Sequence, residues 1–144
     1  MKLSTKGRYG VKAMVELAIH YGDSPLSIRT ISQRQGISEY YLEQLFSPLR
    51  KAKLINSIRG AQGGYLLKKE PKDYTVGMIL RLTEGSLAPV ACIEDDEVIC
   101  DRQNTCVTIM VWKRINDAIS GVVDSITLQD LVDWQHERNG NYVI

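Results

Sequence analysis

The chain has 144 residues, of which 44% are hydrophobic and 24% are charged. These values are those of one ordinary folded domain, or of a small domain with a helical extension, and such a chain folds without disulfides. The net charge is only +1, but residues 1–72 carry +8 and residues 73–144 carry −7. The basic half suits a polyanion such as nucleic acid, whereas the acidic half would be repelled by one.

The first ten residues, MKLSTKGRYG, are polar and basic and do not have the pattern of a secretion signal. No apolar run approaches the roughly 18 residues that a membrane span needs. We therefore expect a cytoplasmic protein with no membrane partner, in which thiols stay reduced.

Two helices are predicted at the start of the chain. Apolar side chains recur at helical spacing in YGVKAMVELAIHYG, residues 9–22, and Gly22 ends this segment. A second, short helix is predicted over residues 27–36, capped by Ser27 and closed by Gly36.

The third predicted helix is the candidate recognition helix of a helix–turn–helix. Ser38 caps it, and Glu39 suits its first turn. Pro48 predicts a kink or a new helix start, because proline removes a backbone hydrogen bond. The buried face is predicted to hold Leu42, Leu45 and Leu49.

After Leu54 the pattern becomes that of strands. INSIRGAQGGYLL, residues 55–67, alternates on both sides of a glycine-rich turn and predicts a hairpin. Three helices and a hairpin are the order of a winged helix–turn–helix, with the hairpin as the wing. A plain structural module could have the same order, but the basic charge favours DNA. We expect a mainly α fold with a small β-hairpin wing, and a DNA-binding domain over residues 1–72.

Residues 73–144 are predicted to hold a sensor loop, residues 92–106, and the dimerisation helices. Helices are expected over residues 75–85, 104–126 and 127–140. An apolar stripe along the long helix predicts a homodimer, which suits palindromic DNA. Packing onto its own winged helix is the competing explanation. The stripe consists of Val107, Met110, Val111, Trp112, Ile115, Ala118, Ile119, Val122 and Ile126.

Residues near the start of a recognition helix reach base edges in the major groove. Gln44 can pair with adenine, and Glu43 can accept a hydrogen bond from cytosine. Glu43 is equally well explained as a solvated surface acid. The outward candidates are Ser38, Tyr40, Tyr41, Glu43 and Gln44.

The hairpin tip and the flanking cations complete the predicted DNA interface. Arg59, which precedes Gly60, can enter an A·T-rich minor groove. Each remaining cation, taken alone, could be an ordinary surface charge. The candidates for phosphate contacts are Lys6, Arg8, Arg50 and Lys51.

All three cysteines lie in CIEDDEVICDRQNTC, residues 92–106, with C-x7-C-x5-C spacing. Thiolates bind soft and borderline metals, and the tight C-x2-C pairs of zinc sites are absent. The wider spacing suits an iron–sulfur cluster. Inert buried cysteines or a redox-sensing pair fit the spacing about as well.

Three segments, LSTKGRYGVKAM, ISEYYLEQLFSPLRKAKLI and SIRGAQGGYLL, closely resemble the bacterial regulator family that includes the iron–sulfur regulator IscR and the cysteine-metabolism repressor CymR. The resemblance covers nearly the whole chain. It implies a homodimeric winged-helix transcription regulator with a long dimerisation helix. It also implies that Arg59 is the wing arginine and that Glu43 and Gln44 face DNA, whereas Tyr40 stands where IscR has a serine.

IscR-like members bind a cluster through three cysteines in this loop, so the resemblance implies Cys92, Cys100 and Cys106 as ligands of a 2Fe–2S cluster. IscR supplies a histidine at the position of Ile109, which cannot coordinate iron, and Arg8 stands where nitric-oxide-sensing relatives have an aspartate. The fourth ligand stays open. Its candidates are Asp101, the acids of residues 94–97 and His136.

The alternative is a repressor of the CymR type, which lacks the cluster and is controlled by a partner enzyme. GSLAPVACIEDDE and the ending NYVI resemble that branch. Cysteine synthase accepts peptides that end in isoleucine, and Ile144 is the last residue here.

An enzyme is not expected. Neither His20 nor His136 has a neighbouring cysteine or acid in a recognisable catalytic order.

Overall fold

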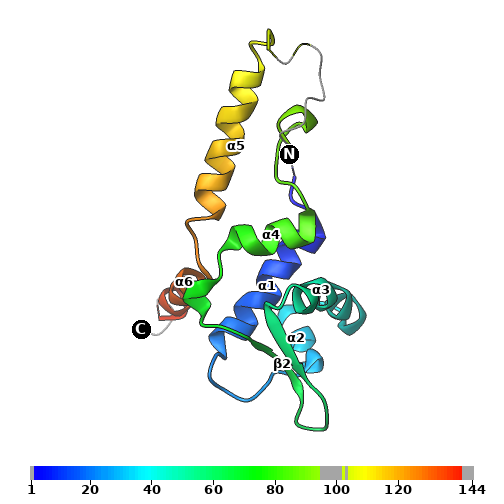
Figure 1. The fold of residues 1–144 in the computed structure, drawn as a ribbon. Coiled ribbons are helices and arrows are strands. Elements are labelled where there is room, and N and C mark those ends of the chain that lie inside the picture. The colour runs from blue at the N-terminus through cyan, green and yellow to red at the C-terminus, as the bar shows by residue number, and fades with distance from the viewer. Residues whose placement is uncertain (1, 95–101, 103, 141–144) are drawn as a thin grey trace.

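Figure 1 shows a helical body that carries a small hairpin, with one long helix extending away from it. The computed structural model describes residues 2–94, 102 and 104–140. This is the predicted fold class, mainly helical with a β-hairpin wing. The helices are α1 (Thr5–Ile19), α2 (Ile28–Gln35), α3 (Glu39–Lys51), α4 (Val76–Glu84), α5 (Ile109–Val123) and α6 (Leu128–Gly140); the strands are β1 (Ile55–Ile58) and β2 (Gly64–Leu67), and two 3-10 turns are η1 (Pro71–Asp73) and η2 (Ala91–Ile93).

Local capping positions α2 and α3 as predicted. The Ser27 side chain accepts a hydrogen bond from the Thr30 backbone N–H, and the Ser38 side chain accepts one from the Tyr41 backbone N–H. Gly36 ends α2 with a φ of 66°, a left-handed conformation that glycine adopts without strain. These signals fix the turn between the two helices of the helix–turn–helix.

The helix α3 runs through Pro48 to Lys51, so of the two outcomes predicted at Pro48 the restart is wrong, and the kink stays a prediction. Leu45 and Leu49 lie on either side of the proline, and both are fully buried. Burying these side chains in one core outweighs the single hydrogen bond that proline removes. The core also contains Met14, Leu17, Ile31, Leu42, Phe46, Ile55, Leu67 and Ile79.

The wing is an antiparallel hairpin in which Ile55 pairs with Leu67 and Ile58 pairs with Gly64. Two further backbone hydrogen bonds, of 2.9 and 2.7 Å, join Leu26 to Tyr65 and attach the wing to the segment before α2. A Cβ on Gly64 would lie 2.2 Å from the Leu26 carbonyl oxygen. The glycine is therefore required for this close approach.

The long helix is shorter than expected, because α5 covers Ile109–Val123 rather than residues 104–126. After it, the Val76 N–H donates to the Ile126 carbonyl and the Leu128 N–H donates to the Tyr74 carbonyl, both at 2.9 Å. This pairing draws the chain out of the helix and returns it to the body, where α6 packs on α1. Among the residues that the structure describes, no helix has both the length and the apolar character needed to cross a membrane.

Candidate DNA interface and cysteine segment

The helix α3 presents a polar face opposite its buried leucines. Tyr40, Glu43 and Gln44 are exposed and lie at the helical spacing that places them on one side. Tyr40 is 71% exposed, which is unusual for a tyrosine without a partner surface. Ser38 is also exposed at the start of the helix, where its side chain acts as the cap.

Tyr41 is placed differently from the other predicted residues. It is half-buried, and its ring meets the ring of Tyr9 edge to face with centroids 5.8 Å apart. The Lys12 ammonium lies 5.6 Å from the centre of the Tyr9 ring. Tyr41 therefore joins the start of the recognition helix to α1.

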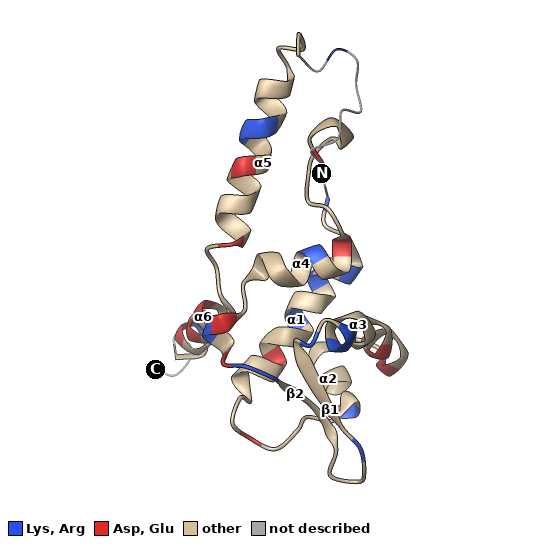
Figure 2. Ribbon diagram, in the orientation of Figure 1, with Lys and Arg blue, Asp and Glu red and all other residues tan. Residues whose placement is uncertain are grey.

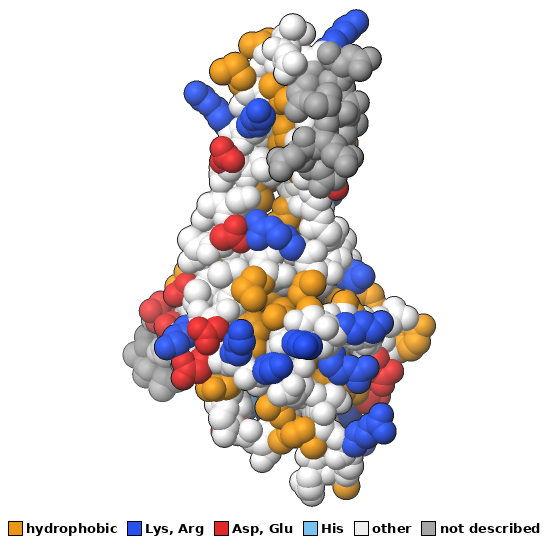
Figure 3. Space-filling model, in the orientation of Figure 1, with side chains coloured by type: hydrophobic (Ala, Val, Ile, Leu, Met, Phe, Trp, Pro, Cys, Tyr) orange, Lys and Arg blue, Asp and Glu red, His pale blue; other side chains and the backbone are white. Residues whose placement is uncertain are grey.

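The predicted cations flank this face and are all exposed. Lys6 and Arg8 lie at the start of α1, which Tyr9 brings beside the start of α3. Lys and Arg residues are spread over the part of the body that holds α1, α3 and the wing, while acidic residues gather around α6 and also occur on α3 (Figure 2 and Figure 3). Arg50 and Lys51 lie at the end of α3, and Arg59 and Gly60 at the wing tip.

Two polar contacts hold the start of α1 and the base of the wing in place. Both join residues far apart in sequence, and the sequence analysis did not predict them. The Glu84 Oε1 atom accepts hydrogen bonds from the Ser4 N–H at 2.9 Å, the Ser4 hydroxyl at 2.5 Å and the Gly7 N–H at 3.1 Å. The buried Tyr74 hydroxyl donates to the Leu54 carbonyl at 2.6 Å, at the base of the wing. Burial raises the pKa of the Tyr74 hydroxyl.

The cysteine segment joins α4 to α5. Cys92 lies in η2 and Cys106 lies just before α5; both are half-buried, and η2 contacts α5. The Cys106 Sγ lies 3.0 Å from the Thr108 hydroxyl. This hydrogen bond, together with one from the Ile109 backbone, lowers the pKa of the Cys106 thiol. Cys100 lies outside the described residues.

The described thiols suit iron, since sulfur is its ligand in clusters. Cys106 precedes the first turn of α5, whereas Ile93, which follows Cys92, lines a pocket with Asn116 and Ser120, at and beyond the middle of the helix. Ile109, where a histidine was expected from the resemblance, is buried at 7% exposure. His136 lies on α6, beyond the other end of a helix about 22 Å long at 1.5 Å per residue. It cannot join Cys106 within one chain. Residues 2–94, 102 and 104–140 contain no group of three metal-ligating side chains, so the predicted site is not assembled by these residues alone.

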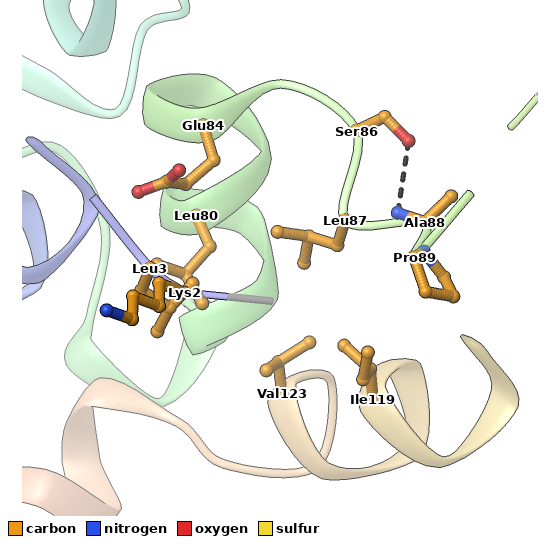
Figure 4. A pocket seen from close by; sticks show the side chains of 10 residues that line it. All are labelled: Lys2, Leu3, Leu80, Glu84, Ser86, Leu87, Ala88, Pro89, Ile119 and Val123. Carbon is orange, nitrogen blue, oxygen red and sulfur yellow. Dashed lines mark hydrogen bonds between the residues drawn. The ribbon is translucent and has the colours of Figure 1, made fainter. Parts of the chain in front are cut away.

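A cavity of about 400 Å³ lies between the end of α4, the segment that follows it and the end of α5 (Figure 4). Leu80, Leu87, Ile119 and Val123 give it an apolar lining, and Glu84 lies at its edge. The cavity extends the apolar surface of α5 towards the body.

A helix–turn–helix followed by a wing, with a polar face on the second helix, defines a DNA-binding regulator of transcription. Residues 3–134 match the Rrf2 family, which is described as an iron-dependent transcriptional regulator family. The chain belongs to this family, and it is a family of regulators rather than of enzymes.

Two groups of relatives are similar to this chain. The HTH-type transcriptional regulator CymR of Bacillus subtilis is 49% identical over 143 residues, which cover 99% of this chain and 98% of the relative. The regulator IscR of Serratia proteamaculans is 42% identical over 135 residues, which cover 94% of this chain and 81% of the relative.

Solved structures show the same two groups. The structure of B. subtilis CymR has a TM-score of 0.77 at 48% identity and covers 93% of this chain and 98% of its own. The structure of T. potens IscR has a TM-score of 0.76 at 45% identity, with coverage of 96% and 90%. The predicted winged-helix fold is thereby confirmed.

Proposed function

We propose that the chain is a homodimeric transcription regulator that binds palindromic double-stranded DNA through α3 and the wing. The observation that carries this proposal is the exposed face of Tyr40, Glu43 and Gln44, with cations on either side of it. In this scheme residues 1–72 bind DNA, and residues 73–144 provide the sensor loop and the dimerisation helices.

The exposed apolar surface of α5 supports the homodimer. Only Ile109 is buried among its residues, whereas Met110 is 60%, Val111 50% and Val122 57% exposed. An antiparallel two-fold pairing about the middle of α5 places Val111 of one protomer beside Val122 of its partner. Such a self-complementary contact is the usual form of a homodimer interface, and it buries side chains that one chain leaves in water.

Binding to DNA is tested by salt and by Arg59→Ala. The affinity for a duplex enriched from random sequence should fall steeply with ionic strength, because phosphate contacts release counterions. Arg59→Ala should weaken binding and blunt any preference for A·T-rich flanks. An affinity that does not change with salt would contradict DNA binding.

The proposed input is a 2Fe–2S cluster held by Cys92, Cys100 and Cys106, with an oxygen ligand in the fourth position. The family's description as iron-dependent and the similarity to IscR support this input. A cluster there would lie in the connection between α4 and α5, where it can bias the DNA-binding state.

Anaerobic purification tests the cluster directly. The protein should be coloured and contain about two irons and two sulfides per chain, as a 2Fe–2S cluster requires. Cys106→Ser should remove the colour. Protein that stays colourless and cannot be reconstituted would refute the cluster.

A second candidate is a repressor that responds to a partner enzyme and has no cluster. The 49% identity to B. subtilis CymR favours it, and CymR is the global cysteine regulator of B. subtilis. The proposed partner is cysteine synthase, which would bind Ile144 at the end of the chain, outside the described residues. Deleting the last four residues should abolish binding in isothermal titration calorimetry; an unchanged affinity would rule this partner out.

A further inference from the structure

The start of α1 has an unfavourable charge distribution that another helix corrects. Lys6 and Arg8 lie near the positive end of the helix dipole, and the first turn holds no acid of its own. The missing carboxylate comes from Glu84, the last residue of α4, through the three hydrogen bonds to Ser4 and Gly7. Glu84 thus fixes the turn that carries two of the cations of the candidate DNA interface.

The same turn contacts the recognition helix. Tyr9 follows Arg8 directly, and its ring packs against Tyr41 in the first turn of α3. The start of α1 is therefore held on one side by α4 and on the other by the recognition helix. Gly85, with a φ of 82°, follows Glu84 and begins the segment that leads to Cys92.

We propose that Glu84 is a positioning residue for DNA binding, which holds the first turn of α1 so that Lys6 and Arg8 reach DNA phosphates. Glu84 ends α4 and precedes the cysteine segment. A ligand that displaces the end of α4 therefore also displaces these two cations. This inference rests on the proposed DNA binding.

Two variants remove the contact from opposite sides, and neither alters a residue of the candidate DNA interface. Glu84→Ala removes the carboxylate. Gly7→Ala places a Cβ 2.2 Å from the Glu84 Oε1 atom and forces the carboxylate away. Glu137→Ala, on the exposed surface of α6, is the control for the loss of an acidic side chain.

The readout is the slope of log affinity against log salt for a duplex that the unmodified protein has enriched from random sequence. Each lost phosphate contact lowers the magnitude of this slope by about 0.9. Glu84→Ala and Gly7→Ala should each lower the magnitude of the slope by up to about 1.8, the value for two phosphate contacts. Glu137→Ala should leave the slope unchanged. A general loss of stability would change the folded fraction and leave the slope of the folded protein as it was.

The variant that combines Glu84→Ala with Gly7→Ala tests whether both substitutions act on the same contact. When the carboxylate is already absent, Gly7→Ala meets no oxygen and should cost no further affinity. Glu84→Gln keeps an acceptor oxygen and should give a slope between those of the unmodified protein and Glu84→Ala. It replaces Glu84→Ala in the test if that variant does not fold. Single variants with an unchanged slope, or fully additive losses, would overturn the role of Glu84. Unmodified protein that binds no duplex at any salt would refute the proposed function itself.

Discussion

Arg81 in α4 holds Asp124 at the end of α5 with both terminal nitrogens of its guanidinium group, Nη1 to Oδ1 at 2.5 Å and Nη2 to Oδ2 at 3.0 Å. Gly77 makes this two-point contact possible, because a Cβ there would lie 2.0 Å from the Asp124 Oδ1 atom. The planar guanidinium group fixes direction as well as distance. This ion pair therefore sets the angle at which α5 leaves the body.

Asp124→Asn should produce a pH-dependent loss of thermal stability. Hydrogen bonding to Arg81 lowers the pKa of Asp124 below its usual value of 3.8. A carboxylate with a lowered folded pKa contributes stability above its unfolded pKa and loses it as pH falls through the folded pKa. The difference in Tm between the two proteins should be full at neutral pH and vanish well below pH 3.8. A difference in Tm that does not change with pH would contradict the role of the pair.

Gly64→Ala should destabilise the wing and its attachment to Leu26. Its Cβ would overlap the Leu26 carbonyl, so the two hydrogen bonds to Tyr65 would be lost or distorted. We expect a loss of about 2 kcal/mol or more in the free energy of unfolding by urea. Gly60→Ala is the control: its φ is also positive, at 108°, but a Cβ there meets nothing within 4 Å. Equal losses in the two variants would show that backbone conformation, and not the contact with Leu26, is responsible.

Tyr74→Phe should cost about 1–3 kcal/mol in the free energy of unfolding, because it removes three hydrogen bonds of a buried side chain and takes the tyrosine hydroxyl away from the Lys69 N–H. The hydroxyl donates to Leu54 and accepts from the N–H groups of Lys68 and Lys69. Hydrogen exchange at Lys68 and Lys69 should become faster in the variant. Unchanged exchange there would mean that the hydroxyl does not anchor the end of the wing.

Val111→Asp should convert the dimer to a monomer, because it places a charge in the proposed contact with the partner's Val122. Light scattering coupled to gel filtration would measure the mass. Lys113→Asp introduces the same side chain at an exposed position almost opposite on the helix and should leave the dimer intact. A dimer that persists with Val111→Asp would exclude α5 as the interface.

The parts of the fold that local chemistry determines could be predicted from sequence. Ser27, Gly36 and Ser38 act within one turn, and the helical period of α3 separated its polar face from its leucines. The end of α5 could not be predicted, because it depends on pairing between Ile126 and Val76, fifty residues apart.

In the candidate site, too, features that depend on neighbouring residues could be predicted, and contacts between distant residues could not. The exposure of Tyr40, Glu43 and Gln44 follows from helical period, so their shared face could be predicted. The packing of Tyr41 on Tyr9 and the contact of Glu84 with Ser4 depend on how helices cross, which no spacing encodes. The cysteines were found by their spacing, but spacing does not specify which atoms complete a metal site.

The backbone bonds between Leu26 and Tyr65 have a consequence for operator architecture. They join the wing to the segment that enters α2, so in the proposed binding mode the wing and the helix–turn–helix of one protomer would meet DNA as one unit. Each half-site of the operator would then be bound by one such unit, whose geometry does not change. An effector that moves α5 would then change the separation between the two units of the proposed dimer, and with it the number of base pairs in the spacer of the operator.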